Sequence, residues 1–212
     1  MTEYEIEPLR GLPGLLPAGE EILWQGSPDW RMLARTAYST RIVAGYFLVL
    51  AAWALVSALV WRGGFLGVEM TVGLGVIGLA LLHVLAWASA RTTVYTLTNR
   101  RIVMRIGIAV PKCVNLPLRT IGSVDLACHA DGTGDIPLVI AGPAKLGILA
   151  LWPHARPWKI VTPQPMLRAI PDAQAVAAMV VQACRSASPE ARASMVETPA
   201  QPAPAFVQAV AA

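Results

Sequence analysis

Charged residues are scarce in this chain of 212 residues. Asp, Glu, Lys and Arg together make up 14% of it, whereas a soluble domain carries about 25% charge. Hydrophobic residues reach 55%, and the mean hydropathy is +0.54. This composition excludes an ordinary soluble protein, because so apolar a chain has to expose much of its surface to lipid.

Paired cysteines and a secretory signal are also missing. Cys113, Cys128 and Cys184 form no CxxC motif and are odd in number, which indicates neither a disulfide framework nor a zinc site. A signal peptide would place a short apolar core within about the first 30 residues, but here polar sequence continues to Arg41. We therefore expect the first hydrophobic segment to be retained.

Two long apolar runs follow this polar start. Residues 42–61 and 70–90 each hold about 20 residues without a charge, enough for a helix to cross a hydrocarbon core of roughly 30 Å. The connection between them, RGGFLGVE, is too short for a domain. We predict a transmembrane helical hairpin over residues 42–90.

Small residues recur along both predicted helices. Ala44, Ala51 and Ala58 are seven positions apart, and Gly75 and Gly78 share a face of the second helix. Such residues let helix backbones approach closely in lipid. The pattern indicates a hairpin that closes on itself or a face for another membrane protein, and self-association of the chain is a third interpretation.

Arginine is distributed unevenly around the predicted hairpin. Its connecting loop holds Arg62 alone, whereas seven arginines flank the open end: Arg31, Arg35, Arg41, Arg91, Arg100, Arg101 and Arg105. Cytoplasmic flanks carry the excess of Lys and Arg. We therefore expect a multi-pass membrane protein, with the N-terminal segment 1–41 and both termini in the cytoplasm.

Alternating patterns replace the helical ones after Arg91. Seven short segments rich in Val, Ile, Leu and Thr are separated by turn residues; they are residues 93–98, 101–108, 112–117, 123–129, 135–141, 146–152 and 158–163. From Pro171 onward, apolar residues recur at helical spacing, namely Val176, Met179, Val180 and Ala183. The tail 186–212, rich in Ala, Pro and Ser, is expected to be disordered.

This plan predicts an α+β membrane protein. After the hairpin, residues 91–185 are expected to form an antiparallel sheet or partly open barrel capped by a C-terminal helix, as in the pleckstrin-homology (PH) fold. The stretches YTLTNRRIVMRIG and VNLPLRTIGSVDL resemble the opening strands of bacterial PH-like domains. In the strand 101–106, Ile102, Met104 and Ile106 are expected to face the core, and Arg101 and Arg105 to lie on a free basic face.

Three further stretches resemble the photosynthetic-complex assembly proteins of purple bacteria, the PuhB type. They are LPAGEEILWQGSPDWRMLARTAYSTR, LWPHARPWKIV and PQPMLRAIPDAQAVA. The resemblance implies a non-enzymatic inner-membrane factor that aids assembly of the reaction centre and its core antenna, with reaction-centre or core light-harvesting subunits as partners. The alternative is a generic PH-like membrane module that binds anionic lipid or another membrane protein.

The basic side chains Arg100, Arg101 and Arg105 suggest contact with lipid headgroups. No ladder of aromatic residues accompanies them, so nucleic acid is not an expected partner. The alternative interpretation is that they only reflect the positive-inside topology and a solvated strand.

Tryptophans mark two candidate partner-binding segments. LWPHARPW is a rigid loop with the composition of a binding hot spot or of a membrane-interface anchor, and LPAGEEILWQGSPDW precedes the first span. We expect residues 16–30 to pack as an extended segment against the PH-like domain, with Glu20 and Glu21 near the basic strand. The candidate partner-binding residues are Trp24, Trp30, Trp152, His154, Arg156 and Trp158.

His83 is the ionisable residue of the predicted spans, which makes it a functional candidate. A neutral imidazole could ligate the magnesium of a bacteriochlorophyll, but Leu79 stands where antenna helices place a small residue. The alternative is a histidine that is hydrogen-bonded within or between hairpins. We expect no metal site, no resident cofactor beyond this pigment and no catalytic residues, because no catalytic motif is present.

Overall fold

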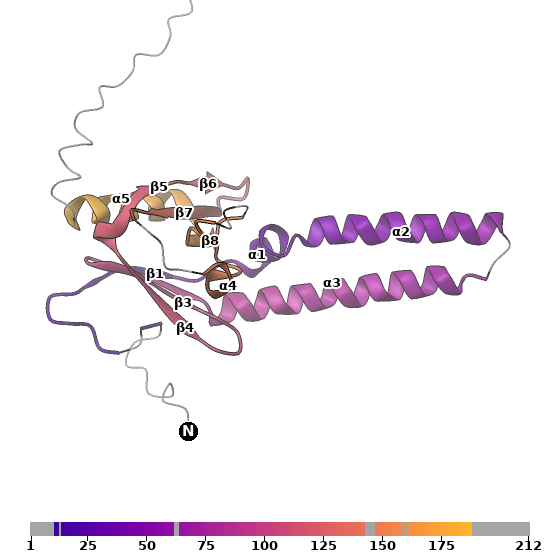
Figure 1. The fold of residues 1–212 in the computed structure, drawn as a ribbon, viewed down its shortest axis with the longest axis horizontal. Coiled ribbons are helices and arrows are strands. Elements are labelled where there is room, and N and C mark those ends of the chain that lie inside the picture. The colour runs from indigo at the N-terminus through magenta and orange to yellow at the C-terminus, as the bar shows by residue number, and fades with distance from the viewer. Residues whose placement is uncertain are drawn as a thin grey trace, which may run out of the picture.

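Two long helices project side by side from one end of a β-rich domain (Figure 1). The computed structural model describes residues 11–12, 14–61, 64–142, 147–157, 159 and 161–187. The two helices are α2 (Thr40–Val60) and α3 (Leu66–Thr92), and both are long and apolar enough to be candidate membrane spans. α3 begins four residues before the predicted start at residue 70, with Glu69 in its first turn, where a carboxylate favours the helix dipole.

The hairpin packs against itself through a glycine. A Cβ atom on Gly75 would lie only 3.0 Å from Cγ of Phe47, so the absence of a side chain at Gly75 lets α3 approach the Phe47 ring of α2 closely. The remaining surface stays apolar and uncovered, as for Leu48, Trp53 and Ile77. These outer faces suit lipid or another membrane helix as neighbour.

The domain begins with a strand from the N-terminal segment. β1 (Ile22–Gly26) pairs antiparallel with β2 (Val94–Thr98), which follows α3 directly. β3 (Arg101–Ile106) and β4 (Lys112–Pro117) complete a first sheet of order β1-β2-β3-β4. The prediction that residues 16–30 pack on the domain as an extended segment is thus confirmed for this strand.

A second sheet and several helices complete the domain. β7 (Gly134–Ile140) lies between β5 (Ile121–Val124) and β6 (Ala127–Cys128) and also pairs with β8 (Met166–Ile170). The helical elements outside the hairpin are α1 (Trp30–Thr36), the 3₁₀ turn η1 (Leu118–Thr120), α4 (Ile148–Leu151) and α5 (Ala173–Ala187).

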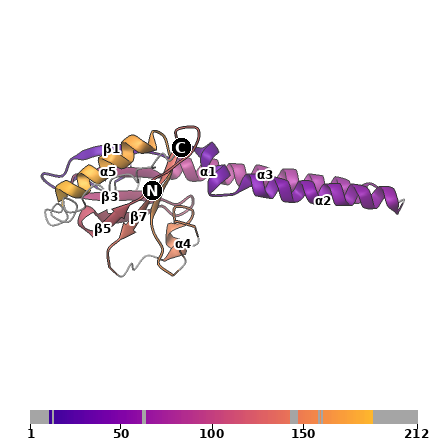
Figure 2. The ribbon, with the colours of Figure 1, turned by 90° about the horizontal axis from the view of Figure 1, so that it is seen from above.

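The core lies between the two sheets and under α5 (Figure 2). Ile102, Met104 and Ile106 point into it as the alternation of β3 predicts. α5 contributes Val176 and Val180 from its apolar face, so this helix closes the domain as predicted. Antiparallel sheets capped by a C-terminal helix confirm the predicted PH-like fold.

Two of the predicted strands are wrong. Residues 146–152 contain the short helix α4, because Leu and Ala favour a helical turn over a strand. Residues 158–163 form no strand in their described part, whereas Met166–Ile170, which is not among the seven predicted strands, is β8. The bounds 91–185 of the PH-like domain stay a prediction, and β1 adds a strand from the N-terminal segment to its first sheet.

A buried ion pair fastens the N-terminal segment to β3. Arg101 donates from Nε and Nη2 to the two carboxylate oxygens of Glu20, at 2.8 and 3.1 Å, and the Thr98 hydroxyl donates to the same carboxylate at 2.8 Å. Burial raises the pKa of Glu20, but these hydrogen bonds outweigh it and hold the pKa below its ordinary value. Glu20 is therefore ionised at neutral pH.

The second face of β3 is not free, which corrects the expectation of a basic surface. Val103 is fully buried between Arg101 and Arg105, and Arg101 is engaged by Glu20. Residues 11 and 12 lie over the same side of the sheet, since a Cβ atom on Gly11 would meet the Val94 side chain. The N-terminal segment therefore covers the face of β3 that the sequence analysis expected to be exposed to solvent.

We predict that Glu20→Gln lowers the free energy of unfolding by about 1–3 kcal/mol, because a charge-assisted bidentate pair is lost. Chemical unfolding of the purified protein in detergent measures it, with the exposed Glu21→Gln as control. The Glu20 contribution is present above its ordinary pKa of 4.5 and disappears as the pH falls through the lower folded value. A constant difference between wild type and variant down to pH 2 would contradict this assignment.

Candidate functional site

Buried polar side chains gather where the hairpin joins the domain. They come from the first residues after α3, from β7 and β8 and from the loop that follows α4, and α1 closes the region (Figure 1). The group consists of Thr93, Tyr95, Asp135, His154 and Arg168, each at most 8% exposed. We call it the junction cluster.

His154 is the centre of the junction cluster. The Tyr95 hydroxyl lies 2.6 Å from Nδ1, and the Thr93 hydroxyl lies 3.1 Å from Nε2. The Tyr95 oxygen also accepts the backbone N–H of Arg168 at 3.3 Å. Both ring nitrogens of His154 therefore have a hydroxyl partner, and Tyr95 joins the ring to the backbone of β8.

Burial decides the protonation of both rings. It lowers the pKa of His154 to about 3, and the charge of Arg168 acts in the same direction. Burial also raises the pKa of Tyr95 above its ordinary value. Both side chains are therefore neutral at physiological pH, which suits a hydrogen-bonded structural unit and makes proton transfer at neutral pH unfavourable.

Arg168 connects the cluster to the base of the hairpin. Its guanidinium donates to the carbonyl of Pro153 at 3.0 Å and to that of Thr36, the last residue of α1, at 3.4 Å. Its Nε lies 4.0 Å from Asp135 Oδ2, so the buried charge has an anionic neighbour. Three separate segments thus meet at one side chain.

The residue after Arg168 is held in an unusual conformation. Ala169 has φ 48°, the left-handed region, at a cost of roughly 1–2 kcal/mol for a residue with a Cβ. Its N–H donates to Asp135 Oδ1 at 2.8 Å, and its carbonyl accepts the N–H of Asp29 at 2.8 Å. These bonds stabilise the bend and link β8 to the start of α1.

An apolar seam beside the cluster holds the hairpin to the domain. Leu33 and Ala34 of α1 pack against Ala86 and Ala90 near the end of α3, and Ala169 joins them from β8. Small side chains on α3 allow this close approach. The seam and the junction cluster together fix the hairpin relative to the sheets.

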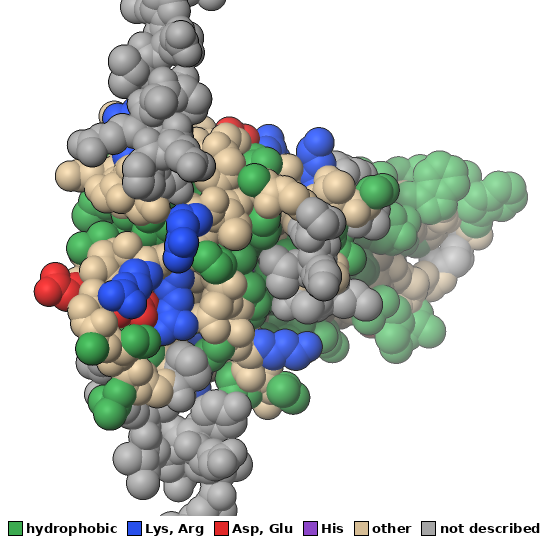
Figure 3. All heavy atoms as spheres, turned by 60° about the vertical axis from the view of Figure 1, so that its left-hand side comes forward, with side chains coloured by type: hydrophobic (Ala, Val, Ile, Leu, Met, Phe, Trp, Pro, Cys, Tyr) green, Lys and Arg blue, Asp and Glu red, His purple; other side chains and the backbone are tan. Residues whose placement is uncertain are grey.

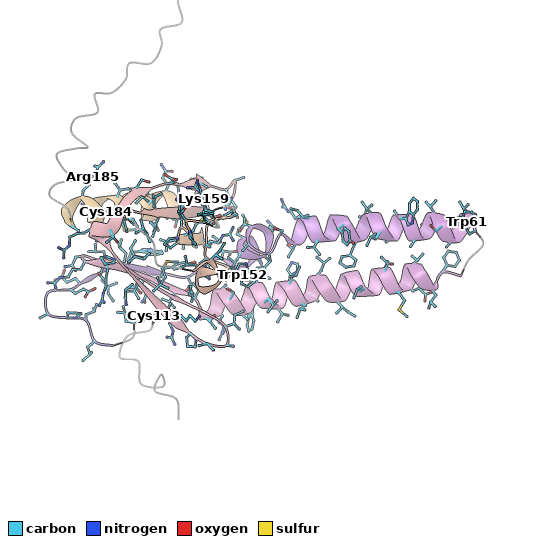
Figure 4. The ribbon with its side chains drawn as sticks, in the orientation of Figure 1. Trp61, Cys113, Trp152, Lys159, Cys184 and Arg185 are labelled. Carbon is cyan, nitrogen blue, oxygen red and sulfur yellow. The ribbon has the colours of Figure 1, made fainter. Side chains whose placement is uncertain are left out.

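Aromatic and basic side chains surround the base of the hairpin. Trp152 is 57% exposed and meets Tyr38 edge to face, with ring centroids 5.5 Å apart. Figure 4 shows Trp152 at this base and Trp61 at the far tip. Arg31 lies over the Trp30 ring. Near the end of α3, Arg91 lies over the Trp87 ring in the same way. Such pairs suit the interface between hydrocarbon and water.

The candidate partner-binding residues have different positions. Trp152 lies on the surface, and Arg156 is half-buried in an ion pair with Asp125 at 2.9 Å. Trp24 packs against the core, whereas Trp30 packs against the apolar seam. Trp158 lies outside the described residues.

His154 requires a correction. The sequence analysis placed it among the partner-binding residues, but its side chain is fully buried by Tyr95 and its neighbours and presents no surface to a partner. Its position in a loop between two tryptophans suggested a surface residue. Only the folded structure places β2 over the His154 side chain.

The predicted lipid-contacting arginines also differ from one another. Arg101 is paired with Glu20, and Arg100 donates to the carbonyl of Ala18 at 3.3 Å. Both lie at the end of β2 that is remote from α3, whereas Arg105 is opposite Val94, directly after α3. Headgroup contact by these arginines stays a prediction, and Arg105 is the one nearest the hairpin.

His83 is exposed on α3. Its Nδ1 lies 2.7 Å from the carbonyl of Leu79 one turn earlier, which agrees with the alternative of a histidine hydrogen-bonded within the hairpin. Pigment ligation by His83 stays a prediction. Among the described residues, no group of three or more His, Cys, Asp or Glu is placed to hold a metal ion.

Hydrophobic and basic side chains occupy different parts of the molecular surface. Figure 3 shows hydrophobic side chains over the receding hairpin and Lys and Arg side chains over the domain in front. The sequence analysis missed Tyr95, Asp135 and Arg168 as members of a site. Arg168 was the available signal, because a charge inside the apolar strand MLRAI has to find buried partners.

We predict that Tyr95→Phe lowers the free energy of unfolding by about 1–3 kcal/mol, because Nδ1 of His154 and the N–H of Arg168 lose a buried partner. Chemical unfolding in detergent measures the change. Tyr46→Phe, at an exposed position of α2, is the matched control. Equal stability of the two variants would show that the hydroxyl does not support the junction.

Comparison with known proteins agrees with this architecture. The family model described as bacterial PH domain matches residues 39–183, from the hairpin to α5. An uncharacterized 23.7 kDa protein in the puhA 5′ region of Rhodobacter capsulatus is 38% identical over 191 residues, which cover 87% of this chain and 88% of the relative. No solved structure matches the chain. The chain therefore belongs to the bacterial PH-domain family, and its similarity to the puhA-region protein is consistent with the predicted PuhB type.

Proposed function

We propose that this protein is an integral membrane factor that aids assembly of the photosynthetic reaction centre and its core antenna. It acts through protein contacts and catalyses no reaction. The observation that carries the proposal is the 38% identity, over most of both chains, to a protein from the puhA 5′ region, which suggests a photosynthesis-related role. The PuhB-type stretches in the sequence point in the same direction.

The architecture supports a scaffold with two contact surfaces. The outer faces of α2 and α3 expose large apolar side chains to the membrane. The domain exposes Trp152 beside the base of the hairpin, and a large aromatic ring at such a position is typical of a binding hot spot. Client subunits would meet the first surface within the bilayer and the second at its cytoplasmic boundary.

A rigid junction serves this role. The junction cluster and the apolar seam hold α3 against the domain, so a client that contacts both surfaces meets them at a fixed separation. Preorganised surfaces bind without a cost for ordering the two parts. We place the domain and both termini in the cytoplasm, because arginines gather at the open end of the hairpin.

Affinity purification from photosynthetically growing purple bacteria tests the proposed clients. The tagged full chain is extracted in mild detergent, with an equally tagged, unrelated two-span protein as control. We expect reaction-centre or core light-harvesting polypeptides with the chain and not with the control. Recovery of lipid alone would contradict the proposal and favour a generic PH-like membrane module.

We predict that Trp152→Ala reduces the yield of reaction centres by half or more in cells without the native copy, because loss of a hot-spot aromatic costs about 2 kcal/mol or more of binding. Membrane absorbance of the bacteriochlorophyll proteins measures the yield, and immunoblotting verifies the level of the variant. Leu23→Ala is the control, since this large apolar side chain is 48% exposed on β1, opposite the end of β2 that is remote from the hairpin. Normal yield with Trp152→Ala at normal protein level would contradict a contact at this position.

A further inference from the structure

A basic cleft of about 340 Å³ opens beside the start of the hairpin. Three segments form it: α1, the first turn of α2 and the turn between β6 and β7. Its lining residues are Met32, Arg35, Thr36, Arg41, His129, Ala130 and Asp131. Arg35, Arg41 and Asp131 are exposed, so the cleft is separate from the buried junction cluster.

The cleft lies at the level where the apolar surface begins. Arg41 is the second residue of the candidate span α2, and the next residue, Ile42, is already 73% exposed. In a bilayer this boundary separates the hydrocarbon from the headgroups, which extend the total thickness from about 30 Å to about 40–45 Å. Arg35 and Arg41 therefore lie at the depth of the lipid phosphates.

The guanidinium groups of Arg35 and Arg41 can both bind an anion. Among the described residues, neither is paired with a carboxylate, and the recorded contact of the Arg35 guanidinium is the sulfur of Met32 at 3.9 Å. A guanidinium binds phosphate through two parallel N–H groups. Two such groups on adjacent helices can take opposite sides of one phosphate.

Asp131 places one negative charge in the same cleft. Its Oδ1 accepts the hydroxyl of Thr133 at 2.7 Å and the N–H of the same residue at 3.1 Å. These hydrogen bonds hold the pKa of Asp131 below its ordinary value, so the side chain is ionised at neutral pH. It reduces the positive potential of the cleft without pairing with either arginine.

We propose that this cleft binds the phosphate group of an anionic phospholipid of the surrounding bilayer, with Arg35 and Arg41 as the donors. The site differs from the predicted one at Arg100 and Arg101. Those residues lie beyond the far end of the five-residue strand β2, and a strand rises about 3.3 Å per residue, so β2 carries them away from the end of α3. In addition, Arg101 is paired with Glu20. The proposal stands independently of any role in photosynthesis.

Binding in this cleft acts on the junction. Thr36, next to Arg35, carries the carbonyl that accepts Arg168, and Nε2 of His129 lies 3.7 Å from Oδ2 of Asp135. The cleft and the junction cluster therefore adjoin at two points, the carbonyl of Thr36 and the contact between His129 and Asp135. A phosphate that joins α1 to the start of α2 would stabilise the folded hairpin base by an amount that rises with the logarithm of the ligand concentration.

Thermal unfolding of the purified full chain in an uncharged detergent tests the proposal. The probes are phosphatidylglycerol, phosphatidylcholine and inorganic phosphate at equal phosphate concentration. We expect phosphatidylglycerol to raise the unfolding temperature well above the other two. Equal effects of phosphatidylglycerol and phosphatidylcholine, or an effect of inorganic phosphate as large as that of the anionic lipid, would overturn it.

Variants identify the site. In Arg35→Gln/Arg41→Gln we expect the apparent affinity for phosphatidylglycerol to fall about thirtyfold, which corresponds to about 1 kcal/mol for each basic residue. The matched control is Arg119→Gln, an exposed arginine on η1. Asp131→Asn keeps the acceptor for Thr133 and removes the negative charge, so binding should strengthen severalfold, a gain that misfolding does not produce. Unchanged binding by the double variant, or no gain with Asp131→Asn, would overturn the site.

Discussion

The buried guanidinium of Arg168 is the interaction on which the junction between hairpin and domain depends. A charge removed from water is tolerated only when hydrogen-bond acceptors and an opposite charge surround it. Here the acceptors come from the end of α1 and from the loop that follows α4, and Asp135 is the opposite charge. Displacement of either segment would remove one of these acceptors from the buried charge. The backbone of the same residue holds Tyr95, and through it His154, so the start of β2 is bound to the same point.

This constraint determines how the protein meets the membrane. α3 continues into β2 after a single residue, and α1 packs on α3, so the direction of the hairpin follows from the position of the sheets. The aromatic ring of Trp152 and the basic cleft at Arg35 and Arg41 are consequently held at the boundary where the apolar helices begin. The proposed contact surfaces for a client protein and for lipid thus both lie at the base of one rigid hairpin.

The N-terminal segment shows why the alternating pattern of β3 predicts only one of its two buried faces. Alternation in β3 correctly identified Ile102, Met104 and Ile106 as core residues. It could not reveal what covers the other face, because a face of mixed Arg and Val is compatible with solvent as well as with another segment. Glu20 settles the matter through its bidentate contact with Arg101, which makes β1 and its approach part of the domain. A chain segment about 80 positions away supplies the cover.

Local patterns in the sequence by themselves determined the hairpin, the strands β2 to β4 and the apolar face of α5, because length, composition and periodicity act between neighbouring residues. They did not separate α4 from a strand, since four apolar residues fit either. Only the tertiary structure decided which polar residues are buried. Tyr95 meets His154 and Arg168 across 59 and 73 positions, and such contacts depend on strand register and packing, which no local pattern encodes.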